Sequence, residues 1–481
     1  MNERIIKTQQ KKRISKAVTS YWIGLTTLVS ISGVFGLIST IFVSFVEPAA
    51  GGSGIPEVKC YLNGVKVPRL IRFKTLICKA FGVIFSVGSG LCAGREGPMV
   101  HLGAAAAAGL CQGKSTSFPC IDVNILRPFR NDKMKRDYIT GGVAAGIAGA
   151  FGAPIAGVLF SMEEVASFWN QHLTWRNLFC TITTITVVNT LMSGLKEGGT
   201  FGLFSEPQLV VLGSFESQIN KGYNLSQFPI FALIGIFGGL TGSLFIAFNK
   251  RVTILRRKFI LKRSPIVWAI EAVLFTCLTA AIAYVLSMTE GVFHCVDISY
   301  SSDNDLKRFA FHCPEGTFND MSSLFYTPSE DAIKNLLHVN SGYSYQTLIL
   351  FFVTYFILLS LSFGIAVPSG LFIPSLIMGS CMGRLIGQFA QYLLPDVVGI
   401  DPGTFALLGA ASVLGGVMRL TISLTVILME GTSRLLSLFL VVLVAAVFHH
   451  LFTHHCRHQR GCVRSSDRLH SDHRQVGWRH L

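Results

Sequence analysis

Charged residues are scarce in this sequence. Asp, Glu, Lys and Arg make up 14% of the 481 residues, whereas soluble proteins carry roughly a quarter. Apolar stretches of about twenty residues, long enough to cross a bilayer as helices, recur from one end of the chain to the other. Because lipid leaves the backbone no other donors and acceptors, the sequence predicts an all-α, polytopic membrane protein. It excludes a soluble domain with a single anchor.

Acidic residues are the rarer of the two charge signs, with 26 Asp and Glu against 41 Lys and Arg. We exclude nucleic acid as a partner, because the basic residues gather in loops beside apolar segments, as the positive-inside rule describes. The lipid bilayer is the expected surrounding. The basic stretches at 1–16 and 250–263 are predicted to be cytosolic. Segment 289–345 is rich in acidic residues and is predicted to be a luminal loop.

No nucleophile–base pair and no phosphate-binding loop is recognisable, so neither an enzyme nor a cofactor is expected. Most of the 12 cysteines lie in apolar segments, where they act as small apolar residues. Cys295 and Cys313 lie in the predicted luminal loop and are candidates for a disulfide, with free thiols as the equal alternative. Asn224 begins an Asn-Leu-Ser sequon and is a candidate for glycosylation on the same side.

The predicted membrane segments include several that are short or interrupted by Gly and Pro, which is typical of transporters. They lie at 17–46, 73–91, 96–111, 137–152, 154–168, 174–193, 228–249, 265–288, 345–361, 371–391, 403–416, 420–430 and 433–453.

The chain contains an internal repeat. The pattern Gly-x-x-x-Pro-x-x-x-x-Gly occurs at 94–103 and again at 370–379, and residues 148–164 resemble 414–430. This indicates one ancestral unit present twice, at about 17–193 and 228–432, followed by a divergent segment at 433–453. Inverted topology of the two units is inferred from the habit of transporters.

The repeat separates two adjacent carboxylates. Glu163 aligns with Glu430, which favours a structural role at a helix end that both halves share. Glu164 has no counterpart, because Gly431 stands at its aligned position. An unmatched carboxylate at the end of a membrane helix favours a functional role.

Three glycine-rich turns, at 51–56, 94–98 and 370–374, share one design. Glycine allows backbone N–H groups to point together, and proline suits the first turn of a helix. Each turn therefore offers free amides and the positive end of a helix dipole, which together bind anions. Three such ends meeting in the membrane hold an anion weakly enough to release it, and Ser53 adds a hydroxyl donor.

Glu96 lies inside one of these turns, and a deprotonated carboxylate is itself an anion. We expect it to occupy the anion site when charged and to leave it when protonated, so that one side chain gates the path and carries a proton. Glu164 is then the internal relay for that proton. The alternative is that Glu96 forms an ion pair with its neighbour Arg95.

The segments GSGIP, GREGP and GLFIP, in this order and spacing, resemble the three signatures of the CLC chloride channel and transporter family. The resemblance extends over residues 17 to 432. The contexts KCYLNGVKVP, FSMEEVASFWNQHLTW, FNDMSSLF and RLTISLTVILME are most similar to the late-endosomal and lysosomal exchangers, the sixth vertebrate member before the seventh.

The resemblance implies an inverted-repeat bundle of tilted and broken helices that forms a homodimer with one anion path per subunit. It implies that Glu96 is the external gating glutamate, that Glu164 is the internal proton glutamate, and that Ser53 selects chloride. The chloride-binding positions that it implies are Gly52, Ser53, Arg95, Glu96, Gly97, Leu371, Phe372 and Ile373.

The resemblance fades after residue 432. No tyrosine follows Tyr392, although the family places a chloride-coordinating tyrosine after this point, and the nucleotide-binding CBS domains of eukaryotic members are absent. Eight of the 13 histidines lie between residues 449 and 480, in the end of the segment 433–453 and in the tail 454–481. We interpret the tail as an alternative exon or shifted reading frame, with a disordered basic tail or a zinc site at 454–458 as alternatives.

The sequence therefore predicts a chloride/proton antiporter of a late-endosomal or lysosomal membrane, with chloride and protons as its substrates. Two alternatives stay open: a passive chloride channel of the same fold, and a truncated subunit that dimerises without transporting. The stoichiometry and any accessory subunit are not predicted.

Overall fold

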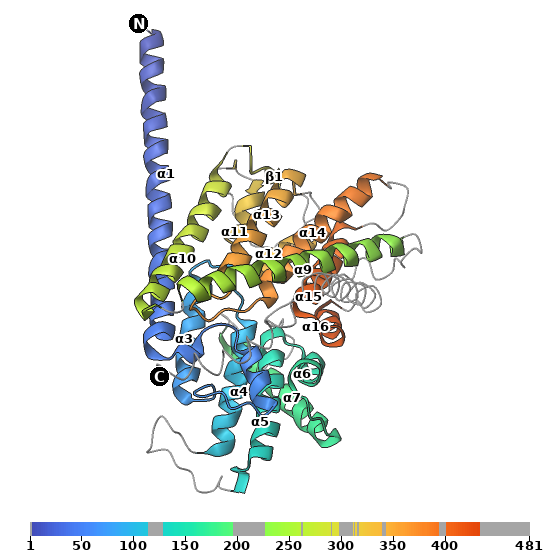
Figure 1. The fold of residues 1–481 in the computed structure, drawn as a ribbon. Coiled ribbons are helices and arrows are strands. Elements are labelled where there is room, and N and C mark those ends of the chain that lie inside the picture. The colour runs from blue at the N-terminus through green and yellow to red at the C-terminus, as the bar shows by residue number, and fades with distance from the viewer. Residues whose placement is uncertain are drawn as a thin grey trace.

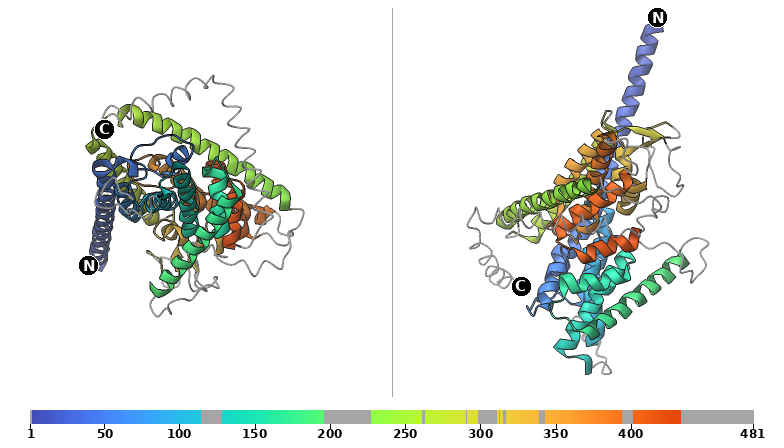
Figure 2. Two further views of the ribbon diagram at one scale, coloured as in Figure 1. Left: turned by 90° about the horizontal axis from the view of Figure 1, so that it is seen from below. Right: turned by 90° about the vertical axis from the view of Figure 1, so that its right-hand side faces the viewer.

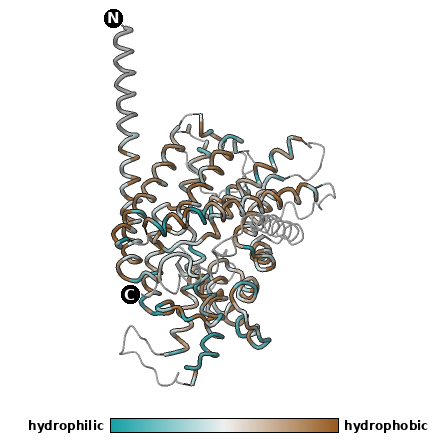
Figure 3. Tube along the Cα trace, viewed as in Figure 1, coloured by the Kyte–Doolittle hydropathy of each residue, from teal (hydrophilic) through white to brown (hydrophobic). Residues whose placement is uncertain are grey.

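The computed structural model describes residues 2–113, 128–195, 227–260, 263–289, 291–297, 311, 313–314, 317–338, 343–393 and 401–432. The candidate glycosylation site at Asn224, the segment 433–453 and the His-rich tail lie outside these residues. The described chain is almost entirely helical, as the sequence predicts, and much of the bundle is hydrophobic (Figure 3).

The elements of the first half of the chain are α1 (Asn2–Ile41), η1 (Phe42–Val46), η2 (Pro48–Ala50), α2 (Ile55–Leu62), α3 (Phe73–Gly88), α4 (Glu96–Gln112), α5 (Asp132–Phe151), α6 (Pro154–Phe160), η4 (Ser161–Val165) and α7 (Gln171–Leu195). Helices α3 to α7 of the first half form the lower part of the bundle in Figure 1, whereas α1 runs upward beside the second half and extends beyond it.

The second half forms the upper part, and the further views in Figure 2 show the same division. Its elements are α9 (Phe228–Phe259), α10 (Pro265–Met288), β1 (Cys295–Asp297), β2 (Thr317–Asn319), α11 (Asp320–Phe325), α12 (Ser329–His338), α13 (Tyr345–Ser362), α14 (Phe372–Leu393), α15 (Pro402–Met418) and α16 (Ile422–Thr432).

Four described helices are long and apolar enough to cross a membrane: Tyr21–Val46, Phe228–Phe259, Pro265–Met288 and Tyr345–Ser362. The others are shorter, or carry Gly and Pro at their ends, as the sequence predicts for a transporter bundle. Large apolar side chains on the outside of the long helices and of α7 are exposed in the monomer, for example Trp175 and Phe179. Such side chains suit contact with lipid or with a second subunit.

The two halves pack their helices in the same way. In the first half Gly103 of α4 faces Gly142 of α5, so a Cβ on Gly103 would lie 3.1 Å from the carbonyl carbon of Gly142. In the second half Gly379 of α14 faces α15, and its Cβ would lie 2.7 Å from the Cα of Ala410. Gly103 and Gly379 are the last glycines of the two repeat patterns. The repeat seen in the sequence is therefore also a repeat of helix packing.

The two aligned carboxylates hold the halves together by reciprocal capping. Glu163 accepts hydrogen bonds from the backbone N–H and the hydroxyl of both Thr421 and Ser423, at 2.7 to 2.8 Å, where α16 begins. Glu430, at the end of α16, accepts from the N–H groups of Ile155 and Ala156 in α6, both at 3.1 Å. Each half thus caps a helix of the other half, which is the structural role expected for Glu163.

The packing of α1 against α10 bears on two of the predicted placements. The hydroxyl of Tyr284, near the end of α10, donates to the carbonyl of Tyr21 at 3.1 Å, whereas Gly36 of α1 lies against Thr276. The two helices are therefore antiparallel, and the residues before Tyr21 extend past the end of α10 that leads into the loop 289–345 (Figure 1). A cytosolic 1–16 and a luminal 289–345 are incompatible.

The start of α1 and the end of α10 therefore lie at the same end of this helix pair, and the side of the membrane that each segment faces stays a prediction. The basic end of α9 and the start of α10 lie at the opposite end of α10 from the loop 289–345. A cytosolic 250–263 and a luminal 289–345 are therefore compatible with each other. The loop also contains the Cys295–Cys313 disulfide, with a Cα–Cα distance of 5.7 Å, which suits an oxidising compartment. The charge of a single basic helix end does not fix its side, because positive charge is a statistical bias over many loops.

The reciprocal caps give a test of stability. Replacing Glu163 or Glu430 with Ala leaves backbone N–H groups at a helix start without acceptors, which costs about 1–2 kcal/mol each. We expect both variants to lower the thermal unfolding midpoint of the detergent-solubilised protein. Glu164→Ala is the matched control, because this neighbouring carboxylate contacts a half-exposed Lys59. An equal drop for all three variants would contradict the capping role.

Candidate functional site

The three glycine-rich turns meet at one place. Gly94 and Gly370 form an isolated antiparallel bridge, in which each N–H donates to the other carbonyl at 2.8 Å. The third turn joins this pair, because the N–H of Gly52 donates to the carbonyl of Val367 at 3.0 Å. Segments 276 and 315 residues apart are thereby connected by backbone hydrogen bonds.

Close contact between the turns depends on glycine. A Cβ on Gly97 would lie 3.1 Å from the Cβ of Ser53 and 3.4 Å from the Cα of Gly370. A Cβ on Gly370 would in turn lie 3.0 Å from the amide nitrogen of Gly97. Ser53, Gly97 and Gly370 therefore bring one residue of each turn into van der Waals contact. Any side chain at the two glycines would separate the turns.

Two long helices begin at this junction. Helix α4 begins at Glu96 and α14 begins at Phe372, and each has its proline at the third helical position. The first N–H groups of a helix have no partner within the helix. The short helix α2 starts beside them after Gly54, whose φ of +84° lies in the left-handed region that favours glycine. The positive ends of three helix dipoles are therefore directed at one small region.

Glu96 lies buried at the junction with 1% of its side chain exposed. Neither of its carboxylate oxygens has a hydrogen-bond partner among the described residues. The backbone amides of Glu96 itself and of Ile373 face it, and Tyr355 of α13 lies close by. A buried carboxylate without a compensating partner is costly, so this position favours a function that needs the group to move or to lose its charge.

The alternative role for Glu96, an ion pair with Arg95, is not what the structure contains. Arg95 instead forms an ion pair with Glu330 of α12. Burial raises the pKa of the Glu330 carboxyl, and the neighbouring Arg95 opposes that shift.

Arg95, Glu96 and Glu330 line one cavity of about 470 Å³, together with Tyr326 and Tyr355. This cavity connects Glu96 to the side of the molecule that carries the disulfide loop.

A buried basic pair lies behind the first turn. The Nζ of Lys79 in α3 lies 2.9 Å from Nδ1 of His101 in α4, and Nε2 of His101 lies 3.0 Å from the carbonyl of Leu70. Both side chains are buried, and both lie where a Cβ on Gly54 would be. We did not predict this pair from the sequence. A lysine within an apolar segment was the available signal.

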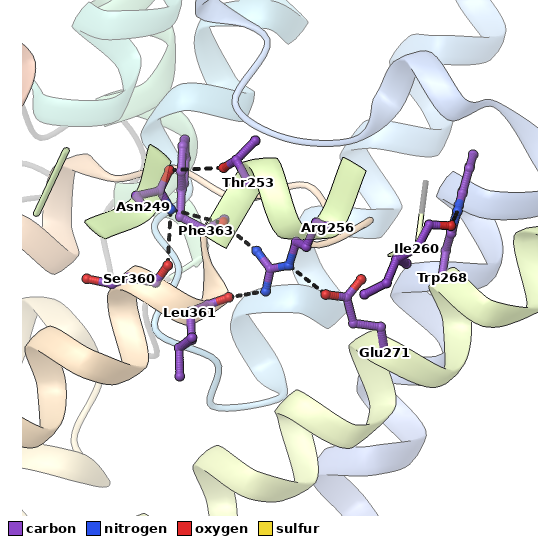
Figure 4. A network of polar contacts seen from close by, with 9 residues as sticks. All are labelled: Asn249, Thr253, Arg256, Ile260, Trp268, Glu271, Ser360, Leu361 and Phe363. Atoms are coloured by element: carbon purple, nitrogen blue, oxygen red, sulfur yellow. Dashed lines mark hydrogen bonds and ion pairs between the residues drawn. The ribbon is translucent and has the colours of Figure 1, made fainter. Parts of the chain in front are cut away.

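The turn at 370–374 is supported by a polar network that Figure 4 shows. Arg256 of α9 donates to the carbonyls of Leu361 and Phe363, the second at 2.8 Å, and its Nε lies 2.6 Å from a carboxylate oxygen of Glu271 in α10. Asn249 adds a bond to the carbonyl of Ser360 at 3.0 Å. These donors satisfy carbonyls at the end of α13 and fix the point from which the chain runs to Gly370.

Glu164 lies apart from the junction, at the end of the first repeat. It forms an ion pair with Lys59 of α2 at 3.2 Å, and the two side chains are 26% and 46% exposed. The structure therefore distinguishes the two neighbouring carboxylates. Glu163 accepts four capping hydrogen bonds. Glu164 instead makes a partly exposed contact with α2, the helix that follows the turn containing Ser53.

These features define a class of protein: a multi-pass membrane protein built from two similar halves whose broken helices point their N-termini at a shared buried site. Residues 35–452 match the family model described as voltage gated chloride channel. The chain belongs to this family, which confirms the resemblance stated from the sequence.

Relatives of similar sequence are named either as an exchange transporter or as a chloride channel protein. The chain is 42% identical over 443 residues to mouse and human proteins named H(+)/Cl(-) exchange transporter 7, covering 92% of this chain and 53–54% of theirs. It is 38% identical over 441 residues to an Arabidopsis thaliana protein named chloride channel protein CLC-d. The chain thus spans about half the length of these relatives. The choice between the sixth and the seventh vertebrate member stays a prediction.

Solved structures share the fold. A eukaryotic CLC transporter superposes with a TM-score of 0.64 at 23% identity, covering 90% of this chain and 64% of that one. A slow cyanobacterial Cl-/H+ antiporter superposes with a TM-score of 0.65 at 21% identity, covering 89% and 84%. The predicted fold class is therefore confirmed.

The glycine contact at the junction can be tested directly. Gly97→Ala adds a methyl group between Ser53 and Gly370, so we expect the turns to separate and chloride binding, measured by calorimetry, to fall at least about tenfold. Gly109→Ala is the matched control in the same helix, because no atom lies within 4 Å of its added Cβ. A normal chloride affinity in Gly97→Ala would show that this contact does not shape the site.

Proposed function

We propose that this chain exchanges chloride for protons across the membrane. The observation that carries the proposal is the meeting of three helix starts around a buried carboxylate without a hydrogen-bond partner. The names of the relatives, exchange transporters for H⁺ and Cl⁻, support it. Because the chain spans about half of those relatives, activity of this chain is itself part of the proposal.

The proposed chloride site consists of backbone amides and one hydroxyl. Partial charges of this kind hold a halide without binding it so tightly that release becomes slow. The backbone hydrogen bonds that join the turns support this kind of site, and Lys79 is the basic side chain that lies against the turn at Gly54. The residues that we propose to contribute are Gly52, Ser53, Arg95, Glu96, Gly97, Leu371, Phe372 and Ile373, with the arginine contributing through its backbone.

Glu96 is the proposed gate. When ionised, its carboxylate competes with chloride for the same amides and closes the path. When protonated, it is neutral, leaves the amides to chloride and carries the proton with it. The cavity of about 470 Å³ beside it supplies space for this movement and a route for the proton.

Glu164 is the proposed internal proton relay. Its counterpart position in the second repeat is Gly431, and in the structure it makes no capping contact of the kind that occupies Glu163. Its ion pair with Lys59 is half exposed, which keeps the carboxylate accessible to water on that side. An accessible carboxylate next to the first turn suits proton exchange with the cytosol.

The rest of the proposal concerns assembly and location. The exposed apolar side chains of α7 suit either lipid or a homodimer partner, and we propose the homodimer from the family resemblance. A late-endosomal or lysosomal membrane is proposed from the same resemblance. A passive chloride channel and a non-transporting subunit remain the alternatives, and transport measurements separate them.

Substitution of the proton relay distinguishes an exchanger from a channel. In proteoliposomes we expect Glu164→Ala to abolish chloride-driven proton movement while chloride flux continues, because the proton path is cut and the anion path is intact. Glu96→Gln should also uncouple the two ions, because a neutral side chain neither carries a proton nor competes with chloride.

Lys59→Gln is the control for the ion pair. It breaks the contact with Glu164 but keeps the carboxylate, so proton coupling should persist. Coupled proton movement in Glu164→Ala would refute the relay role. Chloride flux without proton movement in the wild type would favour the channel, and no flux of either ion would favour the non-transporting subunit.

A further inference from the structure

The side chain of Arg95 is directed away from its neighbour in the chain. Arg95 is the residue immediately before α4, and Glu96 is the first residue of that helix. The guanidinium reaches instead to Glu330 on α12, 235 residues further along the chain. The two adjacent charged side chains at this helix start therefore do not pair with each other. Arg95 pairs instead with Glu330, which belongs to the loop between α10 and α13.

Both charges at the helix start have unused hydrogen-bonding capacity. The two carboxylate oxygens of Glu96 and the Nε of Arg95 are buried and without partners among the described residues. Arg95 is among the charged groups that act on the Glu96 carboxylate, and Glu330 is another. If the contact with Glu330 is lost, Glu96 offers the guanidinium an uncompensated carboxylate on the wall of the same cavity.

An arginine–carboxylate pair is strongest where water is scarce. Glu96 is 1% exposed, whereas the Arg95 and Glu330 side chains are 35% and 23% exposed. A contact between Arg95 and Glu96 would therefore be made deeper than the present one. It would hold the ionised gate in place and delay the exit that exchange requires.

We propose that Glu330 is a positioning residue, which holds the guanidinium of Arg95 on the far wall of the cavity so that the Glu96 carboxylate moves without an arginine partner. The proposal rests on the proposed function of Glu96 as a gate. It assigns to the loop between α10 and α13 a direct part in transport, because α12 belongs to that loop and supplies the carboxylate.

The proposal predicts an asymmetry between the two members of the ion pair. Glu330→Gln frees a cation that can trap the gate, so both chloride and proton flux should fall about tenfold, the scale of one charge-assisted hydrogen bond. Arg95→Gln removes the cation that would trap the gate, so its flux should be clearly higher than that of Glu330→Gln. An ion pair that merely stabilises the fold would make the two substitutions equally harmful.

Two double variants complete the flux test. Glu330→Gln combined with Arg95→Gln should restore transport, because the trapping cation is gone. Glu330→Gln in a Glu96→Gln background should leave chloride flux unchanged, because no ionised gate is present to be trapped. Asp331→Asn, which removes the same charge from the next residue of α12, is the control for charge alone and should have little effect.

A structural measurement keeps this inference separate from the proposed function. The structure of Glu330→Gln, determined at neutral pH by electron cryomicroscopy, should contain Arg95 within hydrogen-bond distance of Glu96. A guanidinium that stays away from Glu96, or a flux loss that persists in the Glu96→Gln background, overturns the proposal. A wild-type protein without flux would refute the proposed exchange activity, and the position of Arg95 in the variant would still decide this inference.

Discussion

The rest of the structure depends on the contact between two helix starts that carry no side chain at the point of approach. Gly94 and Gly370 exchange two backbone hydrogen bonds, and Gly97 approaches both Ser53 and Gly370 at van der Waals distance. This brings free amides from separate helices into one small region. Each of these amides carries only a partial charge, and Lys79 is the buried basic side chain that lies against the turn at Gly54.

Keeping this junction together requires that the two halves hold each other at other points. The capping carboxylates Glu163 and Glu430 do so symmetrically, each satisfying amides at the start of a helix in the other half. The network around Arg256 has a related role, because it ties the end of α13 to α9 and α10 just before the chain turns toward Gly370. The polar groups buried in this bundle thus serve mainly to place backbone ends.

Local sequence was sufficient to predict the helices, the repeat and the three turns, because each depends on residues close together in the chain. The alignment of Glu163 with Glu430 also separated a capping carboxylate from Glu164 before any coordinates were considered. What could not be predicted is which distant residues meet. The partner of Arg95 is 235 positions away, and no pattern near Arg95 distinguishes Glu330 from the other acidic residues of its loop.

The orientation of α1 shows a second limit. Charge beside an apolar segment is weak evidence for its side, since the preference is statistical and applies across many loops. The contact between Tyr21 and Tyr284 is a specific geometric fact, and it makes a cytosolic 1–16 incompatible with a luminal 289–345. Pairwise contacts between antiparallel helices therefore constrain topology more strongly than the charge of a single segment.

The cost of burying Glu96 explains why the site has its particular neighbours. A carboxylate held permanently by an arginine would be stable and immobile, and a carboxylate with no positive potential near it would not ionise at all. Amides at helix starts provide an intermediate environment, which stabilises the charged form but offers no single strong partner. The separation of Arg95 from Glu96 preserves that balance. In the proposed mechanism Glu330, which is remote in sequence and lies between α10 and α13, thereby sets how firmly the Glu96 carboxylate is held.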